Sequence, residues 1–376
     1  MSIDARASSI NRTTSGRIDA GRKQPLGIDR LANGKLIRAE PVADGRQLQP
    51  NQIKQWREQG YTFVNGLTDP EIISKLARSA AKFFPEPGTT AAANISDFGS
   101  TGAMNFPSQV ESLNQVTLDE SLLQAVATLL GDPVTDIRLT QSDVWAKYGH
   151  AAQNGIQDNS DQRIHVDYPN HTLAHPTPWH RPEAVEMIIY LSDAEGDDGG
   201  TAVVPRQGPD DPDYRWPIID SPGIGDLRYI NDRSAAEAYF AGERPELANW
   251  RRSLYEREKR TRYKKGDVLL YRHDTWHRGT PLAMNESRIV HNITFRKAAS
   301  EWISTLHVGW AWQAYRDNKF LEKLIAGASL NQRAVMGFPQ PGSDYWCSET
   351  LQAVAARYGI FGFDIGPYAN PDTSAM

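Results

Sequence analysis

From about residue 137 onward, short runs of β-branched and aromatic residues alternate with clusters of Pro, Gly, Asp and Asn. The runs fall at 137–148, 185–191, 201–204, 268–271 and 289–295. Many short strands separated by turn residues are typical of a β-sandwich or barrel. We therefore predict a mainly β fold with flanking helices.

The residues ahead of this β-rich region predict a helix, a short strand and a second helix. Asn51 is a candidate cap for the first helix and Gly60 for its end, and the strand covers 61–64. Asp69 followed by Pro70 is typical of the start of a helix, because the carboxylate caps free N–H groups and proline suits the first turn.

The remaining parts of the chain differ in composition. Residues 1–47 are rich in basic residues and poor in large apolar ones, so we predict an extended arm, with order beginning near Leu48. A main domain is expected over 48–298. The long connection at about 206–265 is expected to form a lid-like insertion that closes with one helix over 234–259. Residues 299–376 are expected to form a helical extension that packs on the core.

Composition excludes several classes of protein. The single cysteine, Cys347, allows no intramolecular disulfide and no cysteine-based zinc or iron–sulfur site. The net charge of −5 gives no reason to expect nucleic-acid binding, and no run of about 18 apolar residues predicts a membrane span. We expect a cytoplasmic protein with a small-molecule substrate, and the sequence does not decide between a monomer and a homodimer.

Three residues form a candidate metal site. His165 and Asp167 are two apart, so on a strand both side chains would project from one face. His277 follows the apolar run 268–271. Two imidazoles and one carboxylate on one face of a metal are the ligand set of the non-haem Fe(II) oxygenases, which leaves the opposite face open.

Arg288 strengthens this interpretation. It opens the run that ends near Phe295, where Arg288, Asn292 and Thr294 share one face and mainly apolar residues share the other. An inward guanidinium with no evident acidic neighbour calls for an anionic ligand, and its planar fork suits a carboxylate.

Four motifs, in this order, resemble the phytanoyl-CoA dioxygenase-like family of Fe(II)- and 2-oxoglutarate-dependent oxygenases. They are GYTFVNGLTDPEII, His165-Val166-Asp167, VEMIIYLSDAEGDDGGTAVVP and GDVLLYRHDTWHRG, and Arg288 follows at the spacing of the family's 2-oxoglutarate-binding arginine. The resemblance covers about 48–298. It implies a double-stranded β-helix, also called a jelly roll and cupin-like, with its iron site at the open mouth between two sheets.

The resemblance also implies roles for individual residues. His165, Asp167 and His277 would hold Fe(II), and Arg288 would bind the distal carboxylate of 2-oxoglutarate, with O2 as the other co-substrate. Lys147 lies where some members have a second basic contact to 2-oxoglutarate.

Gly279 is a departure from the family, because relatives often have a serine there that assists the arginine. Thr280 or Thr294 is the candidate substitute for that serine.

Candidates for the substrate pocket are Trp276, which adjoins His277, together with Tyr168, Asn170 and Arg206. For Trp276 the alternative is packing, and for Arg206 it is a loop cap. His171 and His175 are expected at a loop or pocket rim and not at a second metal site. The basic run 251–265 is expected to be a solvated helix face, the alternative being a receptor for an anionic substrate tail.

The resemblance implies hydroxylation of an aliphatic C–H of a small organic substrate, lipid-like or a secondary metabolite, with release of succinate and CO2. Desaturation, cyclisation or epimerisation would use the same chemistry. Asp167 stands where related halogenases have a small residue, which argues against halogenation. Two alternatives stay open: a zinc-type metal hydrolase with the same three ligands, and a non-catalytic jelly-roll binding module.

Overall fold

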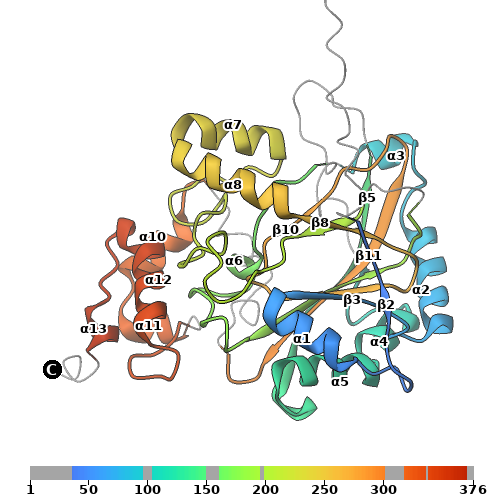
Figure 1. Ribbon diagram of the computed structural model, residues 1–376, viewed down its shortest axis with the longest axis horizontal. Helices are drawn as coiled ribbons and strands as arrows, with labels where there is room; N and C mark the ends of the chain where they lie inside the picture. Colours follow the sequence, from blue (N-terminus) through green and yellow to red (C-terminus); the bar gives the residue numbers. More distant parts are fainter. Residues whose placement is uncertain are drawn as a thin grey trace, which may run out of the picture. The chain divides into compact units, whose positions relative to one another are not determined.

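The computed structural model describes residues 36–95, 104–149, 161–194, 199–300, 317–335 and 338–370. In this part of the chain, a seven-stranded sheet has the order β2-β3-β9-β6-β11-β5-β4 and a four-stranded sheet the order β1-β8-β7-β10 (Figure 1). The strands of the larger sheet are β2 Glu40–Pro41, β3 Tyr61–Asn65, β4 Met104–Asn105, β5 Ile137–Tyr148, β6 Ala184–Tyr190, β9 Val268–Tyr271 and β11 Ser287–Lys297. Those of the smaller sheet are β1 Leu36–Arg38, β7 Thr201–Val203, β8 Lys259–Arg262 and β10 His277–Gly279.

The chain passes back and forth between the two sheets. It leaves β5 in the larger sheet, pairs His165 with His277 of β10, and returns to the larger sheet in β6. It then forms β7 and β8 in the smaller sheet, β9 in the larger, β10 in the smaller and β11 in the larger. This alternation of antiparallel strands between two sheets is the double-stranded β-helix, so the predicted fold class is confirmed.

Helices cover the outer face of the larger sheet (Figure 1). They are α1 Pro50–Gln59, α2 Pro70–Phe83, α4 Glu111–Thr117 and α5 Glu120–Leu130. The apolar residues of α2 recur at helical spacing, and Ile73, Leu76 and Ala80 are buried against strand residues such as Val144 and Ile293. The other face of this sheet meets the smaller sheet across a cluster rich in tyrosine, so each strand residue that points inward faces the interior of the roll.

The caps of the first two helices fit their sequences. Asp69 accepts hydrogen bonds from the backbone N–H groups of Glu71 and Ile72, and Gly60 ends α1 in the left-handed region at φ 89°. The prediction of Asn51 as a cap is wrong, because Pro50 occupies the first helical position and Gln49 is the capping residue.

The insertion between β7 and β8 contains two helices, α7 Arg233–Glu243 and α8 Pro245–Arg257, and not the predicted single helix over 234–259. Proline has no N–H to continue a helix, and Pro245 begins the second one. The basic run at its end is not a solvated helix face throughout. Arg251 is fully buried against Glu237, and residues 259–262 of the run form β8.

At the N-terminal side, regular structure begins before the predicted Leu48. β1 pairs in parallel with β8, and β2 pairs in parallel with β3. These strands were missed because β1 and β2 are only three and two residues long, and their pairing partners are distant in the sequence. The rest of the predicted arm, residues 1–35, lies outside the described residues.

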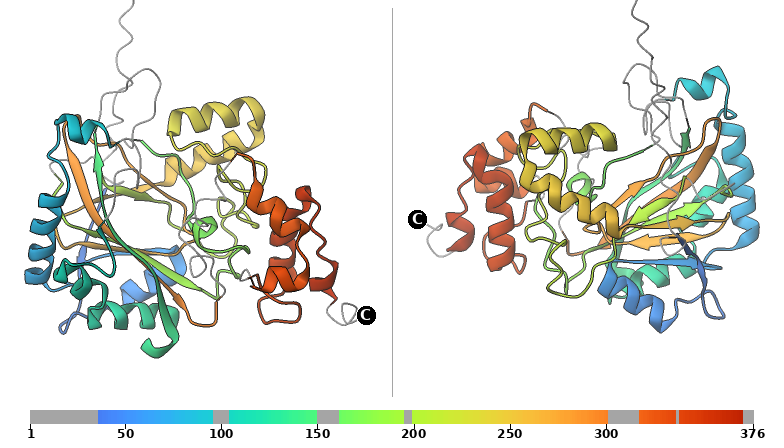
Figure 2. Two further views of the ribbon diagram at one scale, coloured as in Figure 1. Left: turned by 180° about the vertical axis from the view of Figure 1, so that it is seen from behind. Right: turned by 45° about the horizontal axis from the view of Figure 1, so that its top comes forward.

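At the C-terminal side, four helices share an apolar cluster of their own around Phe338 and Tyr358. They are α10 Phe320–Gly327, α11 Leu330–Val335, α12 Ser348–Tyr358 and α13 Gly366–Ala369. In Figure 2 they lie on the side of the chain that carries α6, away from α2. Tyr345 donates a hydrogen bond to the backbone oxygen of His175, and Tyr358 of α12 donates one to that of Leu173, so this C-terminal region supports the segment that follows Asp167. Trp302, Trp310 and Trp312, which belong to the predicted extension, lie outside the described residues.

Short helices complete the described elements: α3 Thr90–Ala93, α6 Tyr168–His171, and the 3-10 turns Val134–Asp136 and Gly359–Phe361. None of the described helices is both long enough and apolar enough to cross a membrane.

Candidate metal centre

The two candidate histidine ligands face each other across a pair of backbone hydrogen bonds. The N–H of His165 donates to the carbonyl of His277 at 2.9 Å, and the N–H of His277 donates back at 2.9 Å. Residues paired in this way in an antiparallel ladder carry their side chains on the same face. The two imidazole rings therefore lie together, with their centroids 4.4 Å apart.

Asp167 reaches the same place from two residues further along. Its backbone N–H donates to the carbonyl of His273 at 3.0 Å, which holds the segment against the loop between β9 and β10. The side-chain period of an extended segment is two, so Asp167 projects on the side of His165.

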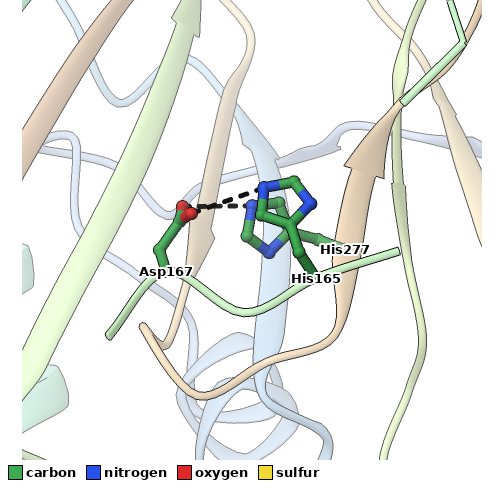
Figure 3. A group of neighbouring side chains, drawn as sticks. All are labelled: His165, Asp167 and His277. Carbon is green, nitrogen blue, oxygen red and sulfur yellow. Dashed lines mark ion pairs between the residues drawn. The ribbon is translucent and has the colours of Figure 1, made fainter. Parts of the chain in front are cut away.

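The three side chains converge on one point (Figure 3). Nε2 of His165 is 3.4 Å from Oδ1 of Asp167, and Nε2 of His277 is 3.1 Å from Oδ2. One ligand atom from each residue can be chosen so that all lie within 4.8 Å of one another. Among the described residues this is the one group of three or more His, Cys, Asp or Glu side chains with such spacing.

The far nitrogen of each ring is anchored to the backbone. Nδ1 of His165 is 3.0 Å from the carbonyl oxygen of Arg163, and Nδ1 of His277 is 2.9 Å from that of Thr275. A carbonyl oxygen only accepts, so each Nδ1 carries a hydrogen, and a ring in its neutral form presents the lone pair of Nε2 to the shared point. Such backbone contacts orient the imidazole ligands of metal sites.

The electrostatics of the triad favour cation binding. Burial would raise the pKa of the Asp167 carboxyl, but the adjacent imidazoles, His277 first, hold it well below its usual range. Burial, followed by the positive charge of Arg163, lowers the pKa of His165 to about 4. Burial also opposes protonation of His277, yet the Asp167 carboxylate raises its pKa above the usual value. The site thus holds an ionised carboxylate and a neutral imidazole away from bulk water.

A second layer of side chains contacts Asp167. The Tyr271 hydroxyl donates to Oδ2 at 3.2 Å and also lies 3.4 Å from Oε2 of Glu186, while Nδ2 of Asn170 lies 3.4 Å from Oδ1. Glu186 is buried and pairs with Nε2 of His171 at 3.3 Å. His171 is therefore at the wall of the site, and it belongs to no second metal cluster among the described residues.

The triad and Arg288 line one cavity of about 130 Å³. Arg288 is buried, and its Nη1 donates to the carbonyl oxygens of Gly199 at 2.5 Å and Gly200 at 3.1 Å. Its Nε has no hydrogen-bond partner, and no carboxylate pairs with the guanidinium within the described parts of the chain. The strand faces are as predicted, because Arg288, Val290, Asn292 and Thr294 line the cavity while Ile293 and Phe295 join the core against the helices.

Two of the other residues predicted for the co-substrate, Lys147 and Thr280, lie close to Arg288. Lys147 is opposite it in the ladder of β5 and β11 and is buried, with Nζ 3.1 Å from the carbonyl oxygen of Thr280. Thr280 donates its hydroxyl to Gly200 at 2.7 Å, the same carbonyl that accepts from Arg288. Thr294 lines the cavity further along β11.

Gln162 accounts for the glycine at position 279. Its Oε1 accepts from the Gly279 N–H at 3.0 Å, and a Cβ at position 279 would lie only 2.6 Å from that oxygen. A serine at this position would collide with the Gln162 side chain unless that side chain moved.

Three of the four candidate substrate residues lie away from the cavity. Trp276 is buried against Trp250 of α8, and the Tyr168 hydroxyl donates to the carbonyl of Ile218. Arg206 stacks on Trp179 in a separate cleft. Asn170 is the one that contacts a member of the triad.

The sequence did not single out several residues that line the cavity. They are Gln141, Gln162, Arg163, Glu186, Tyr229, Asn231 and Tyr271. Arg163 had an available signal, because it lies two residues before His165 and therefore on the same side of the segment as the triad.

The donors present fit the groups that the resemblance implies. Two imidazole nitrogens and one carboxylate, with no thiolate, suit Fe(II), and the buried guanidinium with an unused Nε suits a carboxylate. A double-stranded β-helix with such a triad and such an arginine has the arrangement of the non-haem iron oxygenases that use 2-oxoglutarate.

The sequence profile of the phytanoyl-CoA dioxygenase family (PhyH) matches residues 56–290. The chain belongs to the phytanoyl-CoA dioxygenase family. It is an oxidoreductase of the Fe(II)- and 2-oxoglutarate-dependent type, so the predicted family, enzyme class and cofactors are confirmed. No curated protein matches the sequence.

Solved structures with a similar fold share little sequence with the chain. The non-haem α-ketoglutarate-dependent carbocyclase SnoK from nogalamycin biosynthesis is 15% identical over 70% of this chain and 88% of its own, with a TM-score of 0.46. EctD from S. alaskensis is 15% identical over 69% and 81%, with a TM-score of 0.43. EvdO2 from Micromonospora carbonacea var. aurantiaca, complexed with 2-oxoglutarate, is 12% identical over 67% and 92%, with a TM-score of 0.43.

Proposed function

We propose that the enzyme hydroxylates an aliphatic C–H bond of a small organic substrate. In this reaction, substrate, 2-oxoglutarate and O2 give hydroxylated product, succinate and CO2. The observation that carries the proposal is the convergence of His165, Asp167 and His277 on one cavity that also contains the guanidinium of Arg288, with which no carboxylate of the described residues pairs.

In this proposal His165, Asp167 and His277 hold the iron. The iron, when bound with 2-oxoglutarate and O2, supplies the oxidising chemistry. The Nδ1 contacts to backbone carbonyls fix the orientation of the two rings, and the Tyr271 hydroxyl fixes the carboxylate.

Arg288 binds the far carboxylate of 2-oxoglutarate through its free Nε and the adjacent amine, and Lys147 adds positive charge from the neighbouring strand. Tyr229 and Asn231, from the insertion between β7 and β8, form part of the cavity wall. The insertion thereby limits the access of water to the bound substrate, which is the role expected of a lid.

The first test is succinate release that depends on added 2-oxoglutarate. Replacing His165 or Asp167 by Ala should abolish it, because each variant removes one ligand of the iron. His180→Ala is the matched control, since this histidine is exposed and lies outside the cavity. Full activity in either ligand variant would refute the assignment.

A second test identifies the type of outcome. A pool of candidate substrates is incubated with enzyme, Fe(II) and 2-oxoglutarate, and products are measured by mass spectrometry. Hydroxylation predicts a gain of one oxygen. A loss of two hydrogens would instead indicate desaturation or ring closure, and an unchanged mass with a new isomer would indicate epimerisation.

A further inference from the structure

Arg163 is a buried cation in the wall of the metal cavity. It lies two residues before His165, its residue is only 3% exposed, and its side chain lines the same cavity as the triad and Arg288.

This guanidinium has very few partners. Nη1 donates to Oδ1 of Asn231 at 2.8 Å, and the Tyr229 ring lies 4.9 Å from its central carbon. Nε is buried and has no hydrogen-bond partner among the described residues. No carboxylate forms an ion pair with Arg163 across the described segments of the chain.

Three other arginines that are buried at least as deeply are paired with acids. Arg251 binds Glu237, Arg272 binds Asp274, and Arg278 binds Glu258. A buried charge without a partner is costly, and an arginine cannot lose its charge to avoid that cost. The missing counter-charge at Arg163 therefore calls for a bound anion.

We propose that Arg163 binds an anionic group of the substrate, a carboxylate or a phosphate, within the metal cavity. The inference rests on the proposed function, because it takes the triad as the iron site and Arg288 as the 2-oxoglutarate site. Asn231 and Tyr229 hold the guanidinium in place, so the insertion between β7 and β8 shapes substrate recognition. The substrate is accordingly a small organic acid or phosphate ester whose reacting carbon lies near the triad.

One ligand could compete for this assignment. The carboxylate of 2-oxoglutarate nearest its keto group is also an anion close to the metal. A test must therefore be made with 2-oxoglutarate already bound, so that a second anion can bind only at a second site.

The experiment uses the full chain loaded with Mn(II) and saturating 2-oxoglutarate under anaerobic conditions. Mn(II) accelerates the proton relaxation of molecules that bind near it, and butyrate, methyl phosphate and uncharged butyramide serve as probes. We expect butyrate or methyl phosphate to relax faster than butyramide. The anion with the larger increase in relaxation rate identifies the preferred group. Equal relaxation of all three probes would overturn the inference.

Variants test whether Arg163 is responsible. Arg163→Gln should weaken binding of the anionic probe by about tenfold or more, while Arg163→Lys, which keeps the charge, should retain part of it. Arg206→Gln is the matched control, because Arg206 also stacks on an aromatic ring but lies in a separate cleft. Unchanged probe binding in Arg163→Gln would overturn the inference.

The affinity for 2-oxoglutarate shows whether Arg163 binds the substrate or the carboxylate of 2-oxoglutarate. Arg163→Gln should change it by less than about threefold, whereas Arg288→Gln should lower it by tenfold or more. Equal losses in both variants would assign Arg163 to the co-substrate and overturn the inference. Failure of the wild type to bind Mn(II) or 2-oxoglutarate would instead refute the proposed function, and this inference with it.

Discussion

At the scale of single residues, the carboxylate ligand depends on a tyrosine from another strand. Tyr271, at the end of β9, donates to Asp167 and lies close to Glu186. Replacing Tyr271 by Phe removes the hydroxyl and should lower the affinity for Fe(II) or Mn(II) by about tenfold or more, since partners of metal ligands typically contribute that much. Metal titration measures the effect.

The control for this prediction is Tyr263→Phe. Tyr263 is also buried between the sheets and stacks on Tyr190, and it makes no contact with the triad. An unchanged metal affinity in Tyr271→Phe, or an equal loss in Tyr263→Phe, would show that the hydroxyl does not position Asp167.

The convergence of the triad and Arg288 could be predicted in part, because His165 and Asp167 are two residues apart and Arg288 shares an inward strand face with Asn292 and Thr294. Gln162, Glu186 and Tyr271 could not, because their roles depend on which strands become neighbours. Glu186 and Tyr271 are 85 residues apart and meet only through the register of β6 and β9.

Among the strands, close packing of β7 and β8 fixes the position of the Gly200 carbonyl, which accepts a hydrogen bond from Arg288. A Cβ at Gly200 would lie 2.0 Å from the backbone oxygen of Thr261, so Gly200→Ala must separate the two segments. We expect a loss of about 1–3 kcal/mol in the free energy of unfolding, together with weaker binding of 2-oxoglutarate.

Gly242→Ala provides the comparison. Gly242 lies in α7 with nothing within 4 Å of its added Cβ, so alanine should be neutral or stabilise the helix by up to about 1 kcal/mol. Chemical denaturation and calorimetric titration measure both variants. A Gly200→Ala protein as stable as Gly242→Ala would contradict the described packing.

The positions of the core strands could be predicted from the sequence, whereas the pairing between strands could not. The runs at 137–148 and 268–271 correspond to β5 and β9 residue for residue. The strands β1, β8 and β10 carry no apolar run of their own, and each exists because of a neighbour in the smaller sheet. The break between α7 and α8 could have been predicted from Pro245.

At the scale of the whole molecule, buried neutral histidines should make the fold sensitive to acid. Burial lowers the pKa of His175 and of His291 to about 3. Unfolded histidines bind a proton near pH 6.5, so the unfolded state gains protons below that pH while the folded state does not. Stability should therefore be lost as the pH falls from about 6.5, by roughly 1.4 kcal/mol per pH unit for each histidine.

Urea denaturation at pH 6.5, 5.5 and 4.5 measures this dependence. His291→Asn should be less stable than the wild type at pH 6.5, since the contact of His291 with Ser142 at 2.8 Å is lost. The stability of His291→Asn should then fall less steeply with pH than that of the wild type, because its unfolding takes up about one proton fewer. A slope equal to that of the wild type would show that His291 is not the acid-sensitive group.

An anaerobic titration of the protein with Fe(II) and 2-oxoglutarate, followed by visible absorption, tests whether the triad holds an iron that also binds 2-oxoglutarate. We expect a charge-transfer band that appears only when both are present. The band should disappear in Asp167→Ala and need much more 2-oxoglutarate in Arg288→Gln. Absence of the band in the wild type, or its full persistence in Asp167→Ala, would show that the triad is not the iron site.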